Sequence, residues 1–214
     1  MKRIISLILI LATLLTVTAC RGEKNRDYDE AEVIAAAEKL IYKAVKLNDI
    51  LWGEGFYFDE DSSYTNGDYS PAVPYADYTK LDDLISDCAK VFSSSYMQII
   101  ENTVFSSHFG DTGVNSYARY YQESSTDPIM VKRDYDRLLK AKNEFLYSTL
   151  EVLRSEGDIV IVKIKVKITY EEKDELGAIQ NTLTQQRERE IELIEEADGW
   201  RIYSPCYSNY ISNL

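Results

Sequence analysis

The residues best suited to nucleophilic or metal chemistry are few. The chain holds three cysteines, Cys20, Cys88 and Cys206, and a single histidine, His108. A cysteine nucleophile needs a base within reach and a lowered thiol pKa, yet Cys88 falls on the apolar stripe of a predicted helix. We therefore interpret His108 as a solvated loop residue rather than the partner of Cys88 or Cys206 in a catalytic dyad. So small a set also argues against a structural zinc site.

Cys88 and Cys206 admit two interpretations. Outside the cell membrane two cysteines can form a persistent disulfide, whereas separate buried thiols are common core residues. The sequence leaves both open. Motifs for phosphate, dinucleotide, zinc-protease and serine-hydrolase chemistry are absent from the chain. We predict a protein that is not an enzyme and has no cofactor.

Carboxylates and aromatic side chains concentrate between residues 53 and 78. The acidic residues offer oxygens that hard cations prefer, but their spacing differs from an EF-hand loop, so we predict a solvated acidic loop and no metal site. Tyrosine gives a large contact area at low entropic cost, as in recognition loops. A loop folded back over the sheet on its own aromatics is the equal alternative. The acidic residues are Asp59, Glu60, Asp61 and Asp68. The residues predicted to bind a partner are Trp52, Tyr57, Asp59, Asp61, Tyr64, Tyr69 and Tyr75.

Two arginines mark a second candidate site. Arg187 and Arg189 alternate along a predicted strand and share a face with Ile191 and Leu193. Arginines at the end of an apolar sheet face suit a pocket for a carboxylate. The alternative is a strand whose two faces are both partly wet.

The N-terminus predicts export and anchoring. Met1-Lys2-Arg3 precedes an apolar run from Ile4 to Leu15, which is the layout of a secretory signal and is short for a membrane span. The following Val17-Thr18-Ala19-Cys20 resembles the bacterial lipobox, which implies a diacylglyceryl group on Cys20 and stable anchoring by several acyl chains. An ordinary cleaved signal is the alternative. We predict a signal peptide over 1–19, a lipidated tether over 20–28 and one domain over 29–214, placed outside the cell membrane.

The chain is strongly acidic. It carries 24 basic and 36 acidic side chains, a net charge of −12, and loss of Lys2 and Arg3 with the signal brings the charge to about −14. Such a charge disfavours nucleic acids and anionic lipid headgroups as partners. It suits basic proteins or cations.

The order of predicted elements indicates an α+β fold. Apolar residues spaced by three or four predict a helix over about 29–50, and Thr79 with Asp82 resembles a capping box that begins a second helix. Ser93 to Ser95 can cap a third, shorter helix. Strands are predicted over 117–122, 129–133, 145–154, 158–171, 181–196 and 200–203, with loops over 53–78 and 106–116. Strict alternation along 160–170 predicts a sheet with one buried face. We expect N-terminal helices on a curved antiparallel sheet, similar to the cystatin or nuclear-transport-factor-2 (NTF2) architecture.

Three stretches carry a resemblance to a family. Ile41–Gly55, Tyr78–Thr103 and Asp198–Ile202 resemble, in order and type, the IseA-like inhibitors of cell-wall DL-endopeptidases from Firmicutes. The resemblance implies a non-catalytic inhibitor that blocks the cleft of a peptidoglycan hydrolase. The lipobox departs from that family's prototype, which is secreted without a lipid.

Two functions follow as hypotheses. The first is a membrane-tethered binding module whose 53–78 loop and acidic surface contact a cell-wall hydrolase or another basic protein. The second is an NTF2-like lipoprotein that binds a small ligand between the first helix and the sheet, near Arg187 and Arg189.

Overall fold

The structure is a computed structural model that describes residues 28–73, 76–105, 109–110, 113–114, 118–174 and 178–207. Three residues singled out above, Cys20, Tyr75 and His108, lie outside these ranges. No helix in the described ranges is both long and apolar enough to cross a membrane.

The first described element is the long helix α2, Glu30–Trp52. Asp29 caps it by accepting hydrogen bonds from the backbone N–H groups of Ala31 and Glu32, which are among the donors that a helix start leaves unpaired. The buried residues recur at helical spacing along one face. The predicted helix over 29–50 is confirmed, with an end two residues later.

The main sheet is antiparallel, in the order β6-β7-β8-β9. Its strands are β6 Lys142–Glu156, β7 Ile159–Lys173, β8 Ile179–Glu196 and β9 Gly199–Ile202. The predicted alternation is confirmed in β7, because every second residue from Val160 to Ile168 is fully buried. The lysines between them face outward, where Lys163 pairs with Glu151 at 2.8 Å. The sheet and three helices make the predicted α+β class.

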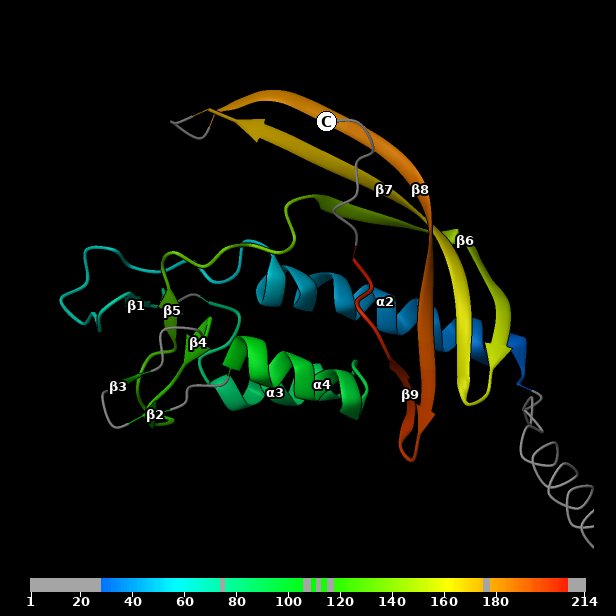
Figure 1. Ribbon diagram of the computed structural model, residues 1–214, viewed down its shortest axis with the longest axis horizontal. Coiled ribbons are helices and arrows are strands. Elements are labelled where there is room, and N and C mark those ends of the chain that lie inside the picture. Colours follow the sequence, from blue (N-terminus) through cyan, green and yellow to red (C-terminus); the bar gives the residue numbers. More distant parts are fainter. Residues whose placement is uncertain are drawn as a thin grey trace, which may run out of the picture.

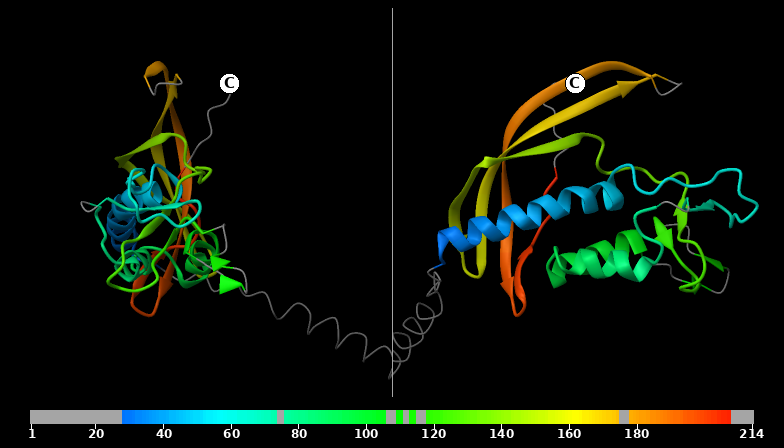
Figure 2. Two further views of the ribbon diagram at one scale, coloured as in Figure 1. Left: turned by 90° about the vertical axis from the view of Figure 1, so that its left-hand side faces the viewer. Right: turned by 180° about the vertical axis from the view of Figure 1, so that it is seen from behind.

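The curved sheet wraps around α2. The β7–β8 hairpin arches over this helix on one side, and the other two helices lie on its other side (Figure 1; Figure 2). They are α3, Leu81–Ala89, and α4, Ser94–Ile100, which runs on into the π-helical turn η1, Glu101–Phe105. The core therefore forms where α2 is enclosed between the sheet and the helical pair.

The starts of the two shorter helices test the capping predictions. Ser93 caps α4 by accepting a hydrogen bond from the N–H of Tyr96, as expected. The Thr79–Asp82 capping box is wrong, since α3 has Lys80 as its N-cap and no side-chain cap from that position. Its first N–H, that of Leu81, instead donates to the side chain of Gln122 at 2.9 Å.

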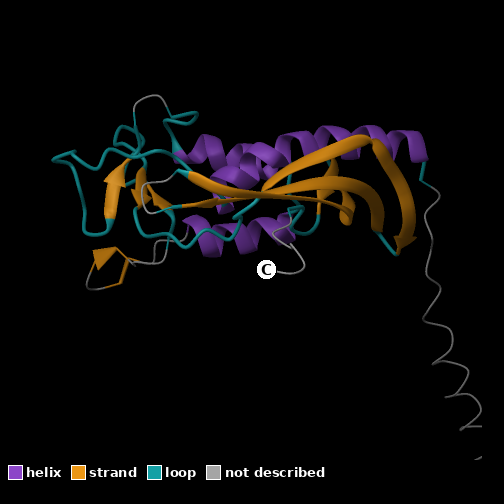
Figure 3. Cartoon of the chain, turned by 90° about the horizontal axis from the view of Figure 1, so that it is seen from above, coloured by secondary structure: helices purple, strands orange, loops and turns teal. Residues whose placement is uncertain are grey.

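A small sheet and a short hairpin stand at the end of the molecule away from the β6–β7 turn (Figure 3). The sheet has the order β1-β5-β4, from Tyr69–Pro71, Met130–Lys132 and Tyr120–Tyr121. The hairpin pairs β2, Phe109–Gly110, with β3, Gly113–Val114. The loops predicted over 53–78 and 106–116 thus contain short strands, and the strands predicted over 117–122 and 129–133 are shorter than expected.

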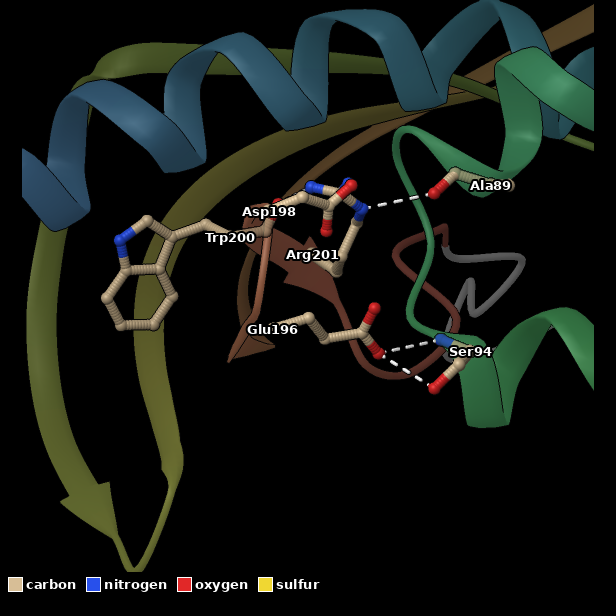
Figure 4. A network of polar contacts seen from close by, with 6 residues as sticks. All are labelled: Ala89, Ser94, Glu196, Asp198, Trp200 and Arg201. Carbon is tan, nitrogen blue, oxygen red and sulfur yellow. Dashed lines mark hydrogen bonds and ion pairs between the residues drawn. The ribbon is translucent and has the colours of Figure 1, made fainter.

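The turn between β8 and β9 fastens the sheet to the helices (Figure 4). One carboxylate oxygen of Glu196 accepts bonds from the backbone N–H and the hydroxyl of Ser94, at 2.8 and 2.9 Å. Arg201 donates to the carbonyl of Ala89 at 3.0 Å and pairs with Asp198. The stretch Asp198–Ile202, which contributed to the family resemblance, therefore has a structural role in this chain.

Candidate binding groove

An open groove of about 1070 Å³ lies between α2 and the arching hairpin. Its walls come from four separate parts of the chain: the last turns of α2 with the residues that follow, the 135–143 segment, the end of β7, and Tyr207. Proteins bind ligands preferentially in concave sites of this size.

Ion pairs cross or border the groove. Arg137 pairs with Glu54 at 2.5 Å, and Lys142 pairs with Glu171 at 2.7 Å. Hydrogen bonding to Glu171 raises the pKa of Lys142. The groove thus presents charges of both signs that are already paired at its solvent-exposed rim. A charged partner could exchange its own groups for them at small cost, because exposed pairs contribute little stability.

Four tyrosines add aromatic surface to the groove: Tyr57, Tyr135, Tyr170 and Tyr207. Tyr57 is 73% exposed, which makes its ring available for contact. Burial raises the pKa values of Tyr135 and Tyr207, so both hydroxyls stay protonated at neutral pH. Aromatic rings beside charges of both signs are typical of surfaces that recognise proteins.

Asn48 forms part of the groove's floor. Its side chain is 2% exposed and donates to the sulfur of Cys206 at 3.1 Å. Its carbonyl oxygen has no hydrogen-bond partner within the described chain. An unpaired buried acceptor costs free energy, so a donor that enters the groove would find a favourable position there.

The two arginines predicted to form a carboxylate pocket bond to the chain itself. Arg189 donates to the backbone carbonyl of Tyr207 at 2.9 Å, and Arg187 donates to Gln185. Both arginines share the concave face as predicted, but neither lines the groove. The chain's own Tyr207 thus takes one nitrogen of the Arg189 guanidinium, while its Nε has no partner among the described residues. The carboxylate pocket at this pair stays a prediction.

The two cysteines are free, buried thiols, so the disulfide is not formed. Cys88 faces the core from α3, whereas Cys206 lies beside Asn48 of α2. Burial raises the pKa of Cys206 to about 11 and that of Cys88 to about 12. Both are therefore neutral at physiological pH, which is unsuitable for a thiolate nucleophile.

The predicted partner-binding loop divides into exposed and buried members. Tyr57 and Tyr64 are exposed, as are Asp59 and Asp61. Trp52 and Tyr69 are buried, which contradicts their assignment to a contact surface. The ring of Trp52 packs against Tyr207, and that of Tyr69 lies edge-on to Tyr121. Among the described residues no cluster of potential ligands could hold a metal ion.

Arg119 was not among the residues predicted to be functional. Its side chain is 2% exposed and donates to the carbonyl of Gly53 at 2.7 Å, at the C-terminal end of α2. Cations stabilise helix C-termini, and the last turn of α2 has no basic residue of its own. The missing basic residue in this turn was the one signal in the sequence that a distant part of the chain would supply the cation. Arg119 also stacks on Tyr135, 4.5 Å from the ring centroid, and thus supports one wall of the groove.

Close packing around Arg119 requires a glycine at position 55. Gly55 has a φ of +78°, and a Cβ there would lie 2.2 Å from Arg119 Nη2 and 2.5 Å from the Tyr120 hydroxyl. That hydroxyl donates to the carbonyl of Ile50 at 2.7 Å. The end of α2, which supplies Asn48 and leads to Glu54, is therefore held by two buried side chains from a distant segment.

A smaller cavity of about 410 Å³ lies on the other side of α2, against α3. Tyr42, which is largely exposed, lies at this cavity, and so do Lys46 and Lys90. Lys46 pairs with Asp77 and Lys90 with Asp87, so these two lysines leave little unbalanced charge.

Comparison with protein-family models finds no match for the chain, and a search among curated proteins likewise finds none.

Proposed function

We propose that this chain is a non-catalytic binding module, held by a lipid on Cys20 at the outer face of the cell membrane. Its groove would take an exposed segment of a protein partner at the cell wall. The class of partner is a peptidoglycan hydrolase, which is what the family resemblance implies, and the proposed effect is inhibition.

One observation carries the proposal: part of the loop predicted to bind a partner lies at the groove. Tyr57 and Glu54 belong to that loop and line the groove together with Lys142 and Tyr170. Aromatic residues surrounded by polar groups are the usual centres of binding energy in protein interfaces. The net charge of −12 supports a partner with a basic surface.

The deciding experiment measures binding and inhibition together. The protein is titrated into each cell-wall hydrolase of its own organism while release of peptidoglycan fragments is followed. Tyr57→Ala should weaken inhibition by about 30-fold, the equivalent of about 2 kcal/mol for a central aromatic contact. Tyr64→Ala is the matched control, because Tyr64 is also an exposed tyrosine of the same loop, 51% exposed, and does not line the groove. Absence of binding and inhibition with every hydrolase would refute the proposal, and equal losses in both variants would refute the role of the groove.

A second candidate is binding of a small ligand in the same groove. The unpartnered buried carbonyl of Asn48 favours it, since that acceptor suits a ligand N–H or O–H group. Native mass spectrometry of protein purified from its own membrane tests this candidate. A mass increment that is lost in Asn48→Ala would support it, and a spectrum of protein without any increment would remove it.

A further inference from the structure

The main sheet has two edge strands that differ in regularity. The pairing of β6 with β7 shifts register twice, between Leu146 and Glu151 and between Val152 and Arg154. Such irregularities are one way in which proteins prevent an edge from pairing with another chain. In contrast, β8 pairs with β7 without interruption from Asn181 to Ile194, so no bulge distorts this part of its outer edge.

Among the described residues, no strand pairs with most of the outer edge of β8. The last strand, β9, covers only Leu193 to Glu196, and the N–H of Tyr203 reaches the carbonyl of Glu192 at 2.8 Å. The β7–β8 hairpin beyond this point forms the upper margin of the molecule in Figure 1. About ten residues of edge are thus left for another strand to pair with.

The direction of the free backbone groups follows from that last hydrogen bond. Since the carbonyl of Glu192 points toward the β9 side, every second residue before it does the same. The residues whose N–H and C=O groups therefore point outward are Thr182, Thr184, Gln186, Glu188 and Glu190. Neither proline nor glycine interrupts this stretch, and its charged side chains are confined to residues 187–190.

We propose that this edge is a dimer interface, at which β8 of one chain pairs antiparallel with β8 of a second copy. A two-fold axis at Thr184 places residue 184 opposite itself, and its outward N–H and C=O groups bond reciprocally. Thr182 then faces Gln186 of the other copy, and both positions lie in the regularly paired part of β8. The main sheets of the two copies join into one continuous sheet.

Charge is compatible with this register, as it is with one centred on Gln186. With the axis at Thr184, no two like charges stand opposite each other, because Arg187 faces Asn181 and the glutamates lie beyond the regularly paired stretch. An axis moved to Glu188 would place that carboxylate directly opposite its own copy, which is unfavourable. The neutral Thr and Gln side chains around Thr184 make the edge complementary to itself, which favours a second copy over a charged partner.

The test uses two variants that differ in a single side chain. Thr182 and Gln186 are exposed, and the proposed register places each opposite the other across the interface. T182K/Q186K creates two opposed lysine pairs, whereas T182K/Q186E creates two lysine–glutamate pairs in the same positions. Both are made in the chain from residue 21, which contains every described element. Their molecular masses are measured by sedimentation equilibrium at low salt over a range of concentrations.

The wild-type chain should sediment with twice the chain mass. T182K/Q186K should raise the dissociation constant by about tenfold or more, from about 1 kcal/mol for each close charge pair. T182K/Q186E should remain at least as dimeric as the wild type, and 1 M salt should narrow the gap between the variants. A wild-type monomer at the highest soluble concentration overturns the proposal. Dimers of equal strength in both variants, or monomers in both, overturn it too, because the charges then do not meet as proposed.

Discussion

Replacement of Gly55 by alanine should be far more damaging than the same replacement at Gly67. Both glycines have positive φ angles, +78° and +57° respectively, which residues with a Cβ adopt only at a cost in free energy. At Gly67 a Cβ would meet no atom within 4 Å, whereas at Gly55 it would meet Arg119 and Tyr120 below any tolerated distance. Comparing Gly55→Ala with Gly67→Ala therefore separates the cost of backbone strain, which both share, from the cost of the steric conflict, which only Gly55→Ala has.

The magnitude follows from the bonds that must move. Gly67→Ala carries only the left-handed backbone cost of about 1–2 kcal/mol. Gly55→Ala carries the same cost and displaces two side chains that are themselves buried. The bond from Arg119 to the Gly53 carbonyl is worth about 1.5–3 kcal/mol and that from Tyr120 to the Ile50 carbonyl about 0.5–1.5 kcal/mol. The expected loss for Gly55→Ala is about 3–6.5 kcal/mol.

Urea unfolding followed by tryptophan fluorescence measures both losses. Trp52 and Trp200 are buried in the core, so unfolding exposes both indoles to solvent. The free energies of unfolding come from the transition midpoints and slopes. Similar losses in Gly55→Ala and Gly67→Ala would show that the end of α2 is not held by Arg119 and Tyr120 as described.

Three further changes test other parts of the fold. Arg119→Met should keep a higher free energy of unfolding than Arg119→Lys, by about 1–3 kcal/mol in denaturant curves. The reason is that lysine retains the buried charge but not the geometry of the bond to Gly53. The opposite order would show that the charge itself is stabilising. Ser93→Ala should cost about 1 kcal/mol through loss of the cap on the N–H of Tyr96, and an unchanged thermal midpoint would contradict this. Burial raises the pKa of Cys206 from 9.0 to about 11, so this thiol stabilises the fold fully below pH 9 and its contribution, up to about 3 kcal/mol, is lost as the pH rises to 11. Cys206→Ala should therefore lose less stability than the wild type between pH 9 and pH 11, and parallel pH profiles would rule this out.

Local periodicity predicted the elements that have one buried face. The helix over 29–50 and the alternating strand over 158–171 are found close to the expected bounds, because a single amphipathic element shows its buried face in its own sequence. The cap at Ser93 was also predictable. The cap at Thr79 was not, because a distant side chain, Gln122, takes the N–H group of Leu81.

The groove was only partly predictable. Tyr57 was included among the partner-binding residues, but Lys142, Tyr170 and Tyr207 join it only through tertiary structure. Composition also selected Trp52 and Tyr69, which are buried. A loop rich in tyrosine does not reveal from its sequence which rings face the solvent and which pack on the chain's own aromatic residues.

The contact between Asn48 and Cys206 joins residues 158 positions apart. The helix α2 also packs against β9, so the first described element completes its burial on the last. Contacts of such long sequence separation slow folding, since the intervening chain must be ordered first. A chain synthesised from its N-terminus therefore keeps part of the apolar face of α2 uncovered until residues 199–206 have emerged. Products truncated before Gly199 should expose that face and be prone to aggregation.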